Sequence, residues 1–588
     1  MKKYLFLLLL VCLAYSVQAQ LKTEKWPNGK TKSEGLLVNE YMEGKWTFYY
    51  ETGIKDQEAE YRKGLLHGYL TSYYENGRKQ SSQRYAWNFK HGSYTEWHKN
   101  DTMAISGFYK GNRKDSIWKW FGENGTPFKV SKFDSTEIEH VLSFWINDST
   151  ESVINGNGTY KTYYFDGAPR ESGYYKNGLK DSVWLFYYPN RNLRAQGEYK
   201  QNTETGAWKT FYENGKPKTE SYYIAGYNKA WYDNNNLEYE GEIKDSKKVG
   251  EWKYYYVNGN LKRTGNYSND KETGLHIGFY SEGGKEYQIN YTSGFKQGTA
   301  NWFRENGTAD IDGNFENDQQ HGIWTYYQEN GTKGNQGEFK YGLMNGSWVW
   351  WYANGTVWKT GSYENDKKHG FWTVYYENGN KYTYGEYSAG KEHGVWMQWF
   401  ENGKIQIKGN FEQGAIQGLW EEWYENQKPK YVLNYLQNIK DGKATYWYEN
   451  GKIRLIEHFS NGKLHGFRSS WSETGQALVS GSYNMEQRIG KWIYYNELGV
   501  KVREESYKNG NKHGTWLVWS NKGRLLQVQG YKNNIRHGSW LSYYENGKIN
   551  SVSNYKNGKK HGLEAKYKKD GSIIVEAYYK NGQFVLKK

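Results

Sequence analysis

Nine histidines occupy one position of a repeating pattern, and imidazole is both a common metal ligand and a proton carrier near neutral pH. Zinc needs ligand nitrogens at about 2.0–2.1 Å from one ion. Equivalent residues in successive two-strand repeats would lie about 9.6 Å apart, so one column cannot close such a site. We therefore expect no metal, no cofactor and a turn-packing role for these residues, which are His67, His91, His321, His369, His393, His465, His513, His537 and His561.

Adjacent and alternate carboxylates are the next candidates for chemistry, because paired acids can act as general acid and base. Asp310 and Asp312 would share one strand face, and two further pairs are Glu421/Glu422 and Glu504/Glu505. No nucleophile or acid partner stands beside them in the sequence, and P-loop, G-x-S-x-G, H-E-x-x-H and dinucleotide-binding motifs are absent from it. We expect these pairs on a solvated surface, no catalytic residues, and no enzyme activity.

A column of tryptophans is the sharper candidate. Large flat rings on an otherwise polar face would stack on sugar rings or anchor a protein partner. The alternative interpretation is that the strand turns one residue away from the expected place and that the column is core. The candidate binding ladder is Trp351, Trp399, Trp423, Trp447, Trp471 and Trp519.

These columns belong to a repeat of 24 residues, which must position them. With Gly322 as position 0, fifteen glycines from Gly226 to Gly562 follow at 24-residue steps, and we count 22 repeats in all. The register slips by 18 inserted residues between Ser116 and Gly158 and by four deleted residues before Gly226. Position +5, the site of the ladder, is aromatic in all 22 repeats, position +17 in 21, and position +2 is Trp in thirteen.

Asn-Gly dipeptides between short aromatic runs indicate hairpins. A two-residue type I′ turn at +8/+9 would set Trp348 opposite Gly361 and Tyr448 opposite Ile453, and a second turn is expected at +19/+20, as at Asn509-Gly510. Positions +2, +15 and +17 would then share one face, and +3, +5, +14 and +16 the other. The sequence therefore predicts an all-β fold, an elongated curved antiparallel β-meander of about 22 tandem 24-residue hairpin repeats.

The expected organisation has four parts: a signal peptide over 1–19, repeats over 20–129, an insertion over 130–157 and a continuous array over 158–588. In the insertion, Asp134 and Glu137 fit a capping box ahead of apolar residues at helical spacing, so a short helix is one of two interpretations. An extra hairpin is the rival interpretation.

The amino terminus has the pattern of an export signal. Lys2-Lys3 precede an apolar run from Leu5 to Leu13, and Val17-Gln18-Ala19 resembles a cleavage site. The single cysteine, Cys12, would be removed with it. The remaining chain has no apolar run of membrane-spanning length and a mean hydropathy of −1.04 for the whole chain, so we expect an exported protein with no transmembrane segment after cleavage.

The net charge is +15 over 588 residues, and we expect it to be spread through the repeats without a basic tail. Such a charge would favour anionic lipid, lipopolysaccharide or acidic glycan, and plain solubility is the alternative interpretation. Export argues against nucleic acid as a partner, despite the basic and aromatic composition.

Segments 370–379 (GFWTVYYENG) and 555–562 (YKNGKKHG) resemble the variant MORN repeat, and the resemblance covers roughly residues 26–585. Bacterial proteins of this kind are commonly labelled YwqK-type antitoxin components. The resemblance implies tandem hairpins and non-enzymatic roles in scaffolding, partner binding and membrane association. An export signal departs from an antitoxin that meets its toxin inside the cell.

We therefore expect a non-enzymatic exported scaffold that binds a protein partner along its aromatic-rich sheet. One alternative is a module that binds envelope glycan or anionic lipid through its aromatic rings and lysines. Another is a component related to YwqK-type antitoxins.

Overall fold

The structure is a computed structural model that describes residues 18–147 and 149–587. The expected signal peptide, 1–19, lies outside the described residues except for its last two positions. In the described part of the chain every regular element is a β-strand, and no helix there is long and apolar enough to cross a membrane.

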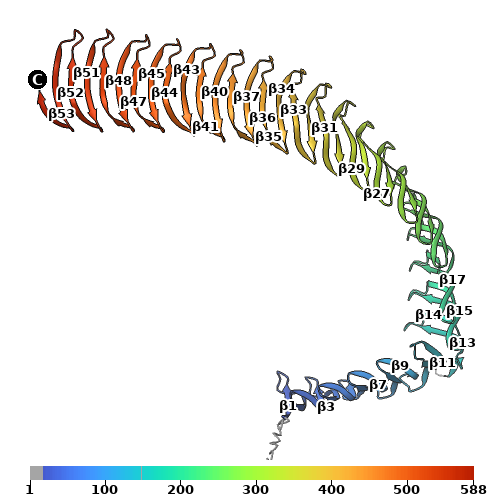
Figure 1. The fold of residues 1–588 in the computed structure, drawn as a ribbon. Helices are drawn as coiled ribbons and strands as arrows, with labels where there is room; N and C mark the ends of the chain where they lie inside the picture. Colours follow the sequence, from blue (N-terminus) through green and yellow to red (C-terminus); the bar gives the residue numbers. More distant parts are fainter. Residues whose placement is uncertain (1–17, 148, 588) are drawn as a thin grey trace, which may run out of the picture. The chain divides into compact units, whose positions relative to one another are not determined.

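The chain forms two units, divided between Gly283 and Gly284, and each is an open antiparallel meander of consecutive strands (Figure 1). The strands of the first unit are β1 (Ala19–Lys25), β2 (Thr31–Val38), β3 (Tyr41–Tyr49), β4 (Lys55–Arg62), β5 (Leu65–Tyr73), β6 (Lys79–Ala86), β7 (Phe89–Trp97), β8 (Met103–Lys110), β9 (Arg113–Phe121), β10 (Pro127–Phe133), β11 (Glu139–Asn147), β12 (Thr150–Ile154), β13 (Asn157–Tyr163), β14 (Pro169–Lys176), β15 (Leu179–Tyr187), β16 (Leu193–Lys200), β17 (Thr203–Phe211), β18 (Pro217–Tyr222), β19 (Ala225–Trp231), β20 (Leu237–Lys244), β21 (Lys247–Tyr255), β22 (Leu261–Ser268) and β23 (Lys271–Phe279).

The strands of the second unit are β24 (Lys285–Thr292), β25 (Phe295–Phe303), β26 (Ala309–Glu316), β27 (Gln319–Tyr327), β28 (Lys333–Lys340), β29 (Leu343–Trp351), β30 (Val357–Glu364), β31 (Lys367–Tyr375), β32 (Lys381–Ser388), β33 (Lys391–Trp399), β34 (Ile405–Glu412), β35 (Ala415–Ile416), β36 (Gly418–Trp423), β37 (Pro429–Leu436), β38 (Ile439–Lys440), β39 (Gly442–Trp447), β40 (Ile453–Ser460), β41 (Lys463–Leu464), β42 (Gly466–Trp471), β43 (Ala477–Asn484), β44 (Gln487–Tyr495), β45 (Lys501–Lys508), β46 (Asn511–Lys512), β47 (Gly514–Trp519), β48 (Leu525–Lys532), β49 (Ile535–Arg536), β50 (Gly538–Tyr543), β51 (Ile549–Lys556), β52 (Lys559–Tyr567), β53 (Ile573–Lys580) and β54 (Gln583–Lys587). The predicted antiparallel β-meander is confirmed.

The first turn of each repeat differs from the prediction at its tip. Trp348 pairs with Gly361 as expected, but the register shifts by one residue so that Trp351 pairs with Val357. The connection is longer than two residues: Gly355 N–H donates to the Tyr352 carbonyl at 2.9 Å, and Gly355 has φ +86°. This is a type I turn followed by a left-handed glycine.

The expected type I′ turn at Asn-Gly is therefore wrong, and Ile453 pairs with Trp447 instead of Tyr448. The physical reason lies in the asparagine side chain. Asn330 Oδ1 accepts the Thr332 N–H at 3.0 Å, and its Nδ2 donates to the Ala353 carbonyl of the next repeat at 2.8 Å. The asparagine thus stabilises its own turn and the contact to the following one.

The second turn is the predicted type I′ turn, with φ +49° at Asn509 and +76° at Gly510. Beyond it, each new repeat begins with a bulge. One residue, Gly361, faces three residues, 370–372, because Ser362 pairs with His369 and Thr360 with Thr373. Gly370 has φ +67°, which a side chain would disfavour. Because the bulge adds two residues, an even number, side chains continue to alternate between the two faces. Residues at one position of the repeat therefore lie on the same face of the sheet in every repeat.

The insertion forms an extra hairpin, β11 and β12, that joins β10 to β13. Of the two interpretations, the structure has the extra hairpin and not the short helix. Asp134 Oδ1 accepts N–H groups of Thr136 and Ile138 at 2.8 and 3.1 Å, and Glu137 has φ +67°, so the carboxylate closes a tight turn instead of capping a helix. Val141 is buried in a core cluster with Trp184.

Candidate binding faces

Positions +2, +4, +13, +15 and +17 lie on one side of the sheet, which we call the tryptophan face. Trp348, at +2, is only 3% exposed although the sheet is a single layer. Its ring lies over Gly337 of the preceding repeat, where a Cβ would come within 1.9 Å of the indole. Its Nε1 donates to the Glu338 carbonyl at 3.2 Å, and Phe339 meets it edge-on at 5.2 Å. Each tryptophan therefore ties one repeat to the one before it.

The two positions in this contact compensate each other in volume. Gly stands at +15 beneath most tryptophans, whereas Leu433 and Ile289 stand at +15 where the next repeat has alanine at +2, namely Ala444 and Ala300. Where Glu457 occupies +15, Arg468 at the next +2 donates to it at 3.0 Å. The contact is thus kept by large-over-small or by opposite charge.

A cation covers many of these rings from position −2. Lys368 lies 4.6 Å from the Trp372 ring, Lys512 4.3 Å from Trp516, and Arg536 4.4 Å from Trp540. Cation–π contacts of this kind leave charge, and not apolar surface, on top of the tryptophans. The tryptophan face therefore suits an anionic or polar ligand better than an apolar one.

The six ladder tryptophans lie on the opposite face, with positions +1, +3, +14 and +16, and all six are partly buried. The turn does lie one residue away from the expected place, as the alternative interpretation had it, but position +5 lies on the face opposite the +2 tryptophans. Lys333 and Lys501 approach the rings of Trp351 and Trp519 at 5.8 and 4.3 Å. A tyrosine at the same position, Tyr327, donates to Asp312 at 2.8 Å.

The backbone of the ladder is held from the preceding repeat. Tyr376 and Tyr424, each at +6, donate their hydroxyls to the carbonyls of Trp399 and Trp447, both at 2.9 Å. These bonds fix the spacing of successive rings. The structure therefore brings Trp399, Trp423, Trp447 and Trp471 together in four successive repeats, while Tyr375 and Tyr495 separate Trp351 and Trp519 from them.

An exposed apolar column was missed by the sequence analysis. Position +1 lies on the ladder's face and carries large side chains open to solvent, with Phe371 59% and Leu419 56% exposed. The signal was present in the sequence as apolar residues directly after the repeat glycine. Members of this column in the second unit are Ile323, Phe371, Val395, Leu419 and Phe467.

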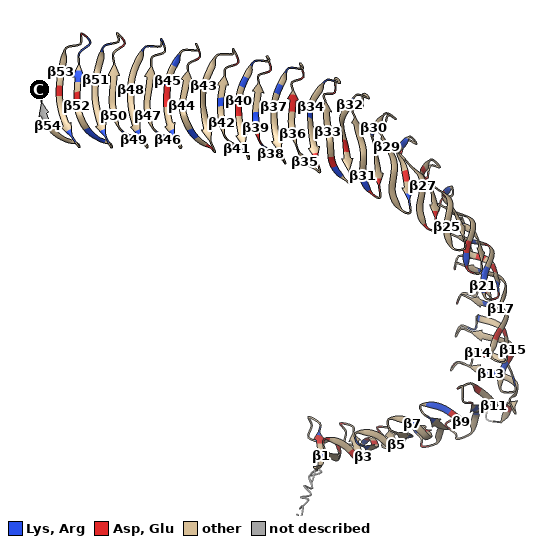
Figure 2. Ribbon diagram, viewed as in Figure 1, with Lys and Arg blue, Asp and Glu red and all other residues tan. Residues whose placement is uncertain are grey.

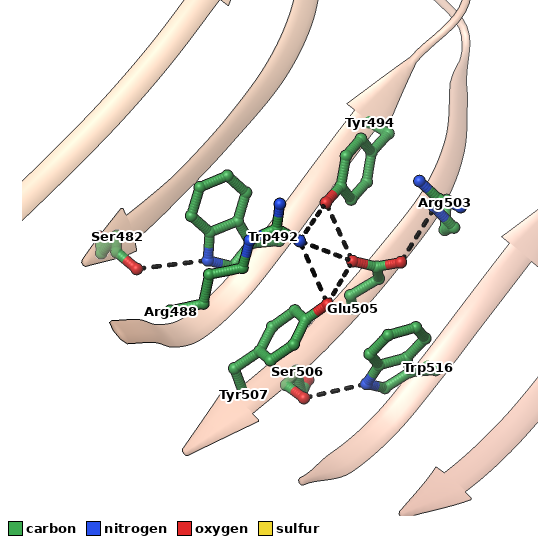
Figure 3. A network of polar contacts seen from close by, with 9 residues as sticks. All are labelled: Ser482, Arg488, Trp492, Tyr494, Arg503, Glu505, Ser506, Tyr507 and Trp516. Carbon is green, nitrogen blue, oxygen red and sulfur yellow. Dashed lines mark hydrogen bonds and ion pairs between the residues drawn. The ribbon is translucent and has the colours of Figure 1, made fainter. Parts of the chain in front are cut away.

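One pair of carboxylates is buried, against expectation. Glu504 and Glu505 lie on opposite faces, and Glu505 is 4% exposed. Figure 3 shows that Glu505 accepts from the hydroxyls of Tyr494 and Tyr507, both at 2.9 Å, and pairs with Arg503 at 3.1 Å and Arg488 at 3.7 Å. The two arginines and the two hydroxyls offset the free-energy cost of burying this carboxylate.

The remaining pairs are also engaged by cations or donors. Asp310 pairs with Arg304 at 2.6 Å, Asp312 accepts from Asn301 at 2.6 Å, and Glu422 pairs with Lys430 at 2.7 Å. These contacts give the acids structural partners.

The histidine column acts at the second turn. His537 and His561 accept, through Nδ1, the N–H of Asn557 and Asn581 in the following turn, at 3.4 and 3.2 Å. In another repeat Gln297 does the same for Asn317 at 3.0 Å. A metal is therefore not needed to explain the column, and in the part of the chain that the structure describes no three His, Cys, Asp or Glu residues gather as a metal site would require.

The positive charge is concentrated near the carboxyl end, which corrects the expectation of an even spread. Residues 501–588 hold 18 Lys and Arg against 6 Asp and Glu, so +12 of the net charge of +15 lies there, while residues 284–500 carry −2. Strands β45 to β53 carry most of these cations (Figure 2). This basic segment, 501–588, creates a local positive field.

Comparison with protein families identifies the family to which these hairpins belong. The MORN repeat variant model matches eight segments, at 42–63, 157–177, 204–225, 248–269, 344–365, 392–413, 440–461 and 536–557. The chain is a MORN-repeat protein. The matched segments recur in both units of this MORN-repeat protein. Each covers most of two consecutive strands and the turn that joins them, as 344–365 covers most of β29 and β30. No curated protein matches the chain.

Among solved structures, "Crystal Structure of TcdB2-TccC3-TEV" is 10% identical, covers 97% of this chain and 32% of that one, with a TM-score of 0.12. "Structure of Photorhabdus luminescens Tc holotoxin pore, Mutation TccC3-D651A" is 11% identical, with 95% and 32% covered and the same TM-score of 0.12. The chain thus spans about a third of the length of the structures it matches. At this TM-score the likeness supports no statement about function.

Proposed function

We propose that this MORN-repeat protein is a non-enzymatic exported scaffold that binds a protein partner along the face opposite the tryptophan face. The observation that carries the proposal is the exposed apolar column at position +1, running beside the partly buried +5 ladder. Contiguous exposed apolar surface on a soluble chain marks an interaction site. Flanking aromatic rings are the side chains that contribute most at protein interfaces.

The regular hydrogen bonds between repeats support a scaffold role as well. The Asn ladder at +8 and the Tyr ladder at +6 fix each repeat against its neighbour, as in Asn330 to Ala353 and Tyr376 to Trp399. A partner would meet a prearranged surface and lose little binding free energy to ordering it.

The test is a binding measurement with a partner captured from an envelope extract and then purified. The variant Phe371→Ser/Val395→Ser/Leu419→Ser removes three members of the exposed column and should weaken the complex at least tenfold. The matched control Leu436→Ser/Ile439→Ser removes apolar side chains of similar exposure beside a type I′ turn and should bind like the parent. Equal affinities of both variants would refute the proposed face.

A second candidate function is binding of envelope glycan or anionic lipid, and the basic segment favours it. Its net charge of +12 would draw anionic groups to the repeats that carry it. Binding to glycan arrays and to phosphatidylglycerol vesicles, with phosphatidylcholine vesicles as control, separates the two ligands. Loss of glycan binding in Trp399→Ala/Trp423→Ala/Trp447→Ala, with folding intact, would assign the glycan to the ladder.

A relation to YwqK-type antitoxins remains a proposal that rests on the repeat sequence alone. It predicts that a neighbouring gene, expressed by itself, arrests growth and that co-expression of this chain without residues 1–19 relieves the arrest. Failure of the relief would leave the label without functional meaning.

A further inference from the structure

A polar cavity of about 310 Å³ lies on the tryptophan face within the basic segment. Four consecutive strands line it, β48, β49, β50 and β51. Its volume lies at the lower end of the range of small-ligand pockets. The residues that matter for its chemistry are Gln527, Gln529, Arg536, Trp540, Ser551 and Ser553.

The same place in the repeat 48 residues earlier is filled by the network of Figure 3. There Arg488 stacks on the Trp492 ring at 4.5 Å and donates to Tyr507 Oη at 3.2 Å. The carboxylate of Glu505 and the ring of Tyr494 complete the arrangement, and Trp492 is 1% exposed. This repeat therefore shows which groups an arginine at position −2 binds: a tyrosine hydroxyl and a carboxylate.

In the cavity the arginine and its aromatic neighbours are kept. Arg536 stacks on Trp540 at 4.4 Å and donates to Tyr555 Oη at 3.3 Å, as Arg488 does with its counterparts. The acid is missing, because Ser553 stands where the earlier repeat has Glu505.

The side chains around that acid have become small as well. Ser542 replaces the Tyr494 ring and Ser551 replaces Arg503, and their Oγ atoms lie 2.6 Å apart. Within residues 18–147 and 149–587, no ion pair forms between Arg536 and a carboxylate. The cavity is the space that the acid and the tyrosine vacate, beside a guanidinium that has lost its anion.

The lining specifies more than an anion. A guanidinium takes a carboxylate through two parallel hydrogen bonds. The hydroxyls of Ser551 and Ser553 and the amides of Gln527 and Gln529 offer donors and acceptors for several ligand hydroxyls. Trp540 is partly exposed, in contrast to Trp492, and holds the guanidinium of Arg536 on its ring. A carboxylate flanked by several hydroxyls describes an acidic sugar.

We propose that this cavity binds a hexuronate residue of an acidic glycan, with the sugar carboxylate taking the place that Glu505 has beside Arg488. The inference rests on the second candidate function, glycan binding, and is independent of the protein-partner proposal, which uses the other face. The basic segment raises the local concentration of an acidic polymer, and the cavity selects the sugar.

The test measures binding of D-glucuronate and D-glucose to the full chain by saturation-transfer NMR titration. Glucuronate should bind at least tenfold more tightly than glucose. Arg536→Gln should weaken glucuronate binding at least tenfold. The matched control Lys512→Gln, which removes the cation at the same position one repeat earlier, should leave the affinity unchanged.

A second variant guards against simple misfolding. Ser553→Glu restores the acid found at position 505 and should abolish glucuronate binding, while hydrogen exchange of peptides covering 549–556 stays as slow as in the parent or slower. Equal binding of glucose and glucuronate, or parent-like binding by Arg536→Gln, would overturn the proposal. Tighter binding of a triglutamate peptide than of glucuronate would overturn the sugar assignment in favour of an acidic protein.

The outcome also separates this site from glycan binding in general. A glucuronate oligosaccharide that loses affinity in Trp399→Ala/Trp423→Ala/Trp447→Ala, but not in Arg536→Gln, would leave the glycan function standing and place it on the ladder. Absence of binding by every acidic and neutral glycan would end both proposals.

Discussion

The contact between a glycine at +15 and the next tryptophan at +2 predicts the outcome of a double substitution. Gly337→Leu alone puts a branched side chain where even a Cβ would lie 1.9 Å from the Trp348 ring. Trp348→Ala alone leaves a hole in place of a ring that is 3% exposed. Combined, the two changes reproduce the pair that the chain itself uses at Leu433 and Ala444.

The magnitudes follow from packing. Overfilling a packed site costs about 1–3 kcal/mol, and truncation of a buried tryptophan costs about 3–5 kcal/mol. Both single variants should therefore loosen the junction of β28 and β29. In the double variant the leucine fills the space vacated by the indole, so the two effects should not add, and a coupling of about 1–3 kcal/mol in favour of the double variant is expected.

The assay must be local, because each repeat contacts its neighbours and long arrays do not unfold in one step. Hydrogen exchange of peptides covering 333–351 measures the opening free energy of this junction directly. Peptides from β52 and β53 provide the internal control and should exchange as in the parent. A double variant that exchanges as fast as the sum of the single effects predicts would refute the volume-compensation argument.

Three further predictions test other parts of the structure. Burial opposes ionisation of Glu58, but hydrogen bonds from Lys55, Lys45 and Tyr73 prevail and lower its pKa from 4.5 to about 2. Its contribution to stability, about 1–2 kcal/mol, is therefore present above pH 4.5 and lost as the pH falls toward 2. The local opening free energies of β4 in Glu58→Gln and the parent, measured by hydrogen exchange, should differ at pH 7 and converge near pH 2. A constant gap over that range would contradict the pairing. Asn330→Ala loses the bonds to Thr332 N–H and to the Ala353 carbonyl, and should raise exchange of residues 328–332 and 352–356 by about 1–2 kcal/mol of local opening, while Asn28→Ala leaves that region unchanged. Expression of the full chain in a bacterial host should yield an exported product whose amino-terminal residue is Gln20, and retention of Met1 in the cytoplasmic fraction would refute the signal peptide.

Much of this architecture was predictable because the same residue types recur at the same positions in many repeats. The spacing of the glycines predicts the meander, and Trp348 opposite Gly361 follows from counting outward from the turn. The type I′ turn at Asn509-Gly510 also follows, since both residues tolerate positive φ. These features depend on neighbours in sequence, which a single chain displays.

The features that were missed depend on contacts between one repeat and the preceding repeat. Trp348 pairs with Gly337 on β28 and with Gly361 on β30, and its ring covers Gly337. Counting outward from the first turn finds only the partner on β30. Volume compensation would have revealed the contact with Gly337, since Leu433 precedes Ala444 and Ile289 precedes Ala300 at the same separation. The turn at Asn-Gly was misassigned because the same dipeptide serves both the type I′ turn and the longer turn ending in a left-handed glycine.

The departures from the repeat's rule point to where specific chemistry resides. Gly-over-Trp packing is kept from Gly313 to Trp420 and recurs at Gly481 with Trp492. It is replaced by Glu457 with Arg468, Glu505 with Trp516 and Ser553 with Glu564. A repeat that lacks the Gly-over-Trp pair loses packing energy. We therefore expect such a repeat to have either a compensating contact or a function. Glu457 and Glu505 have such contacts in their arginine partners. Ser553 has none of that kind, and the arginine beside it keeps its stacking ring and its tyrosine without an acid. A ligand carboxylate supplies there the group that Glu505 supplies to Arg488 two repeats earlier.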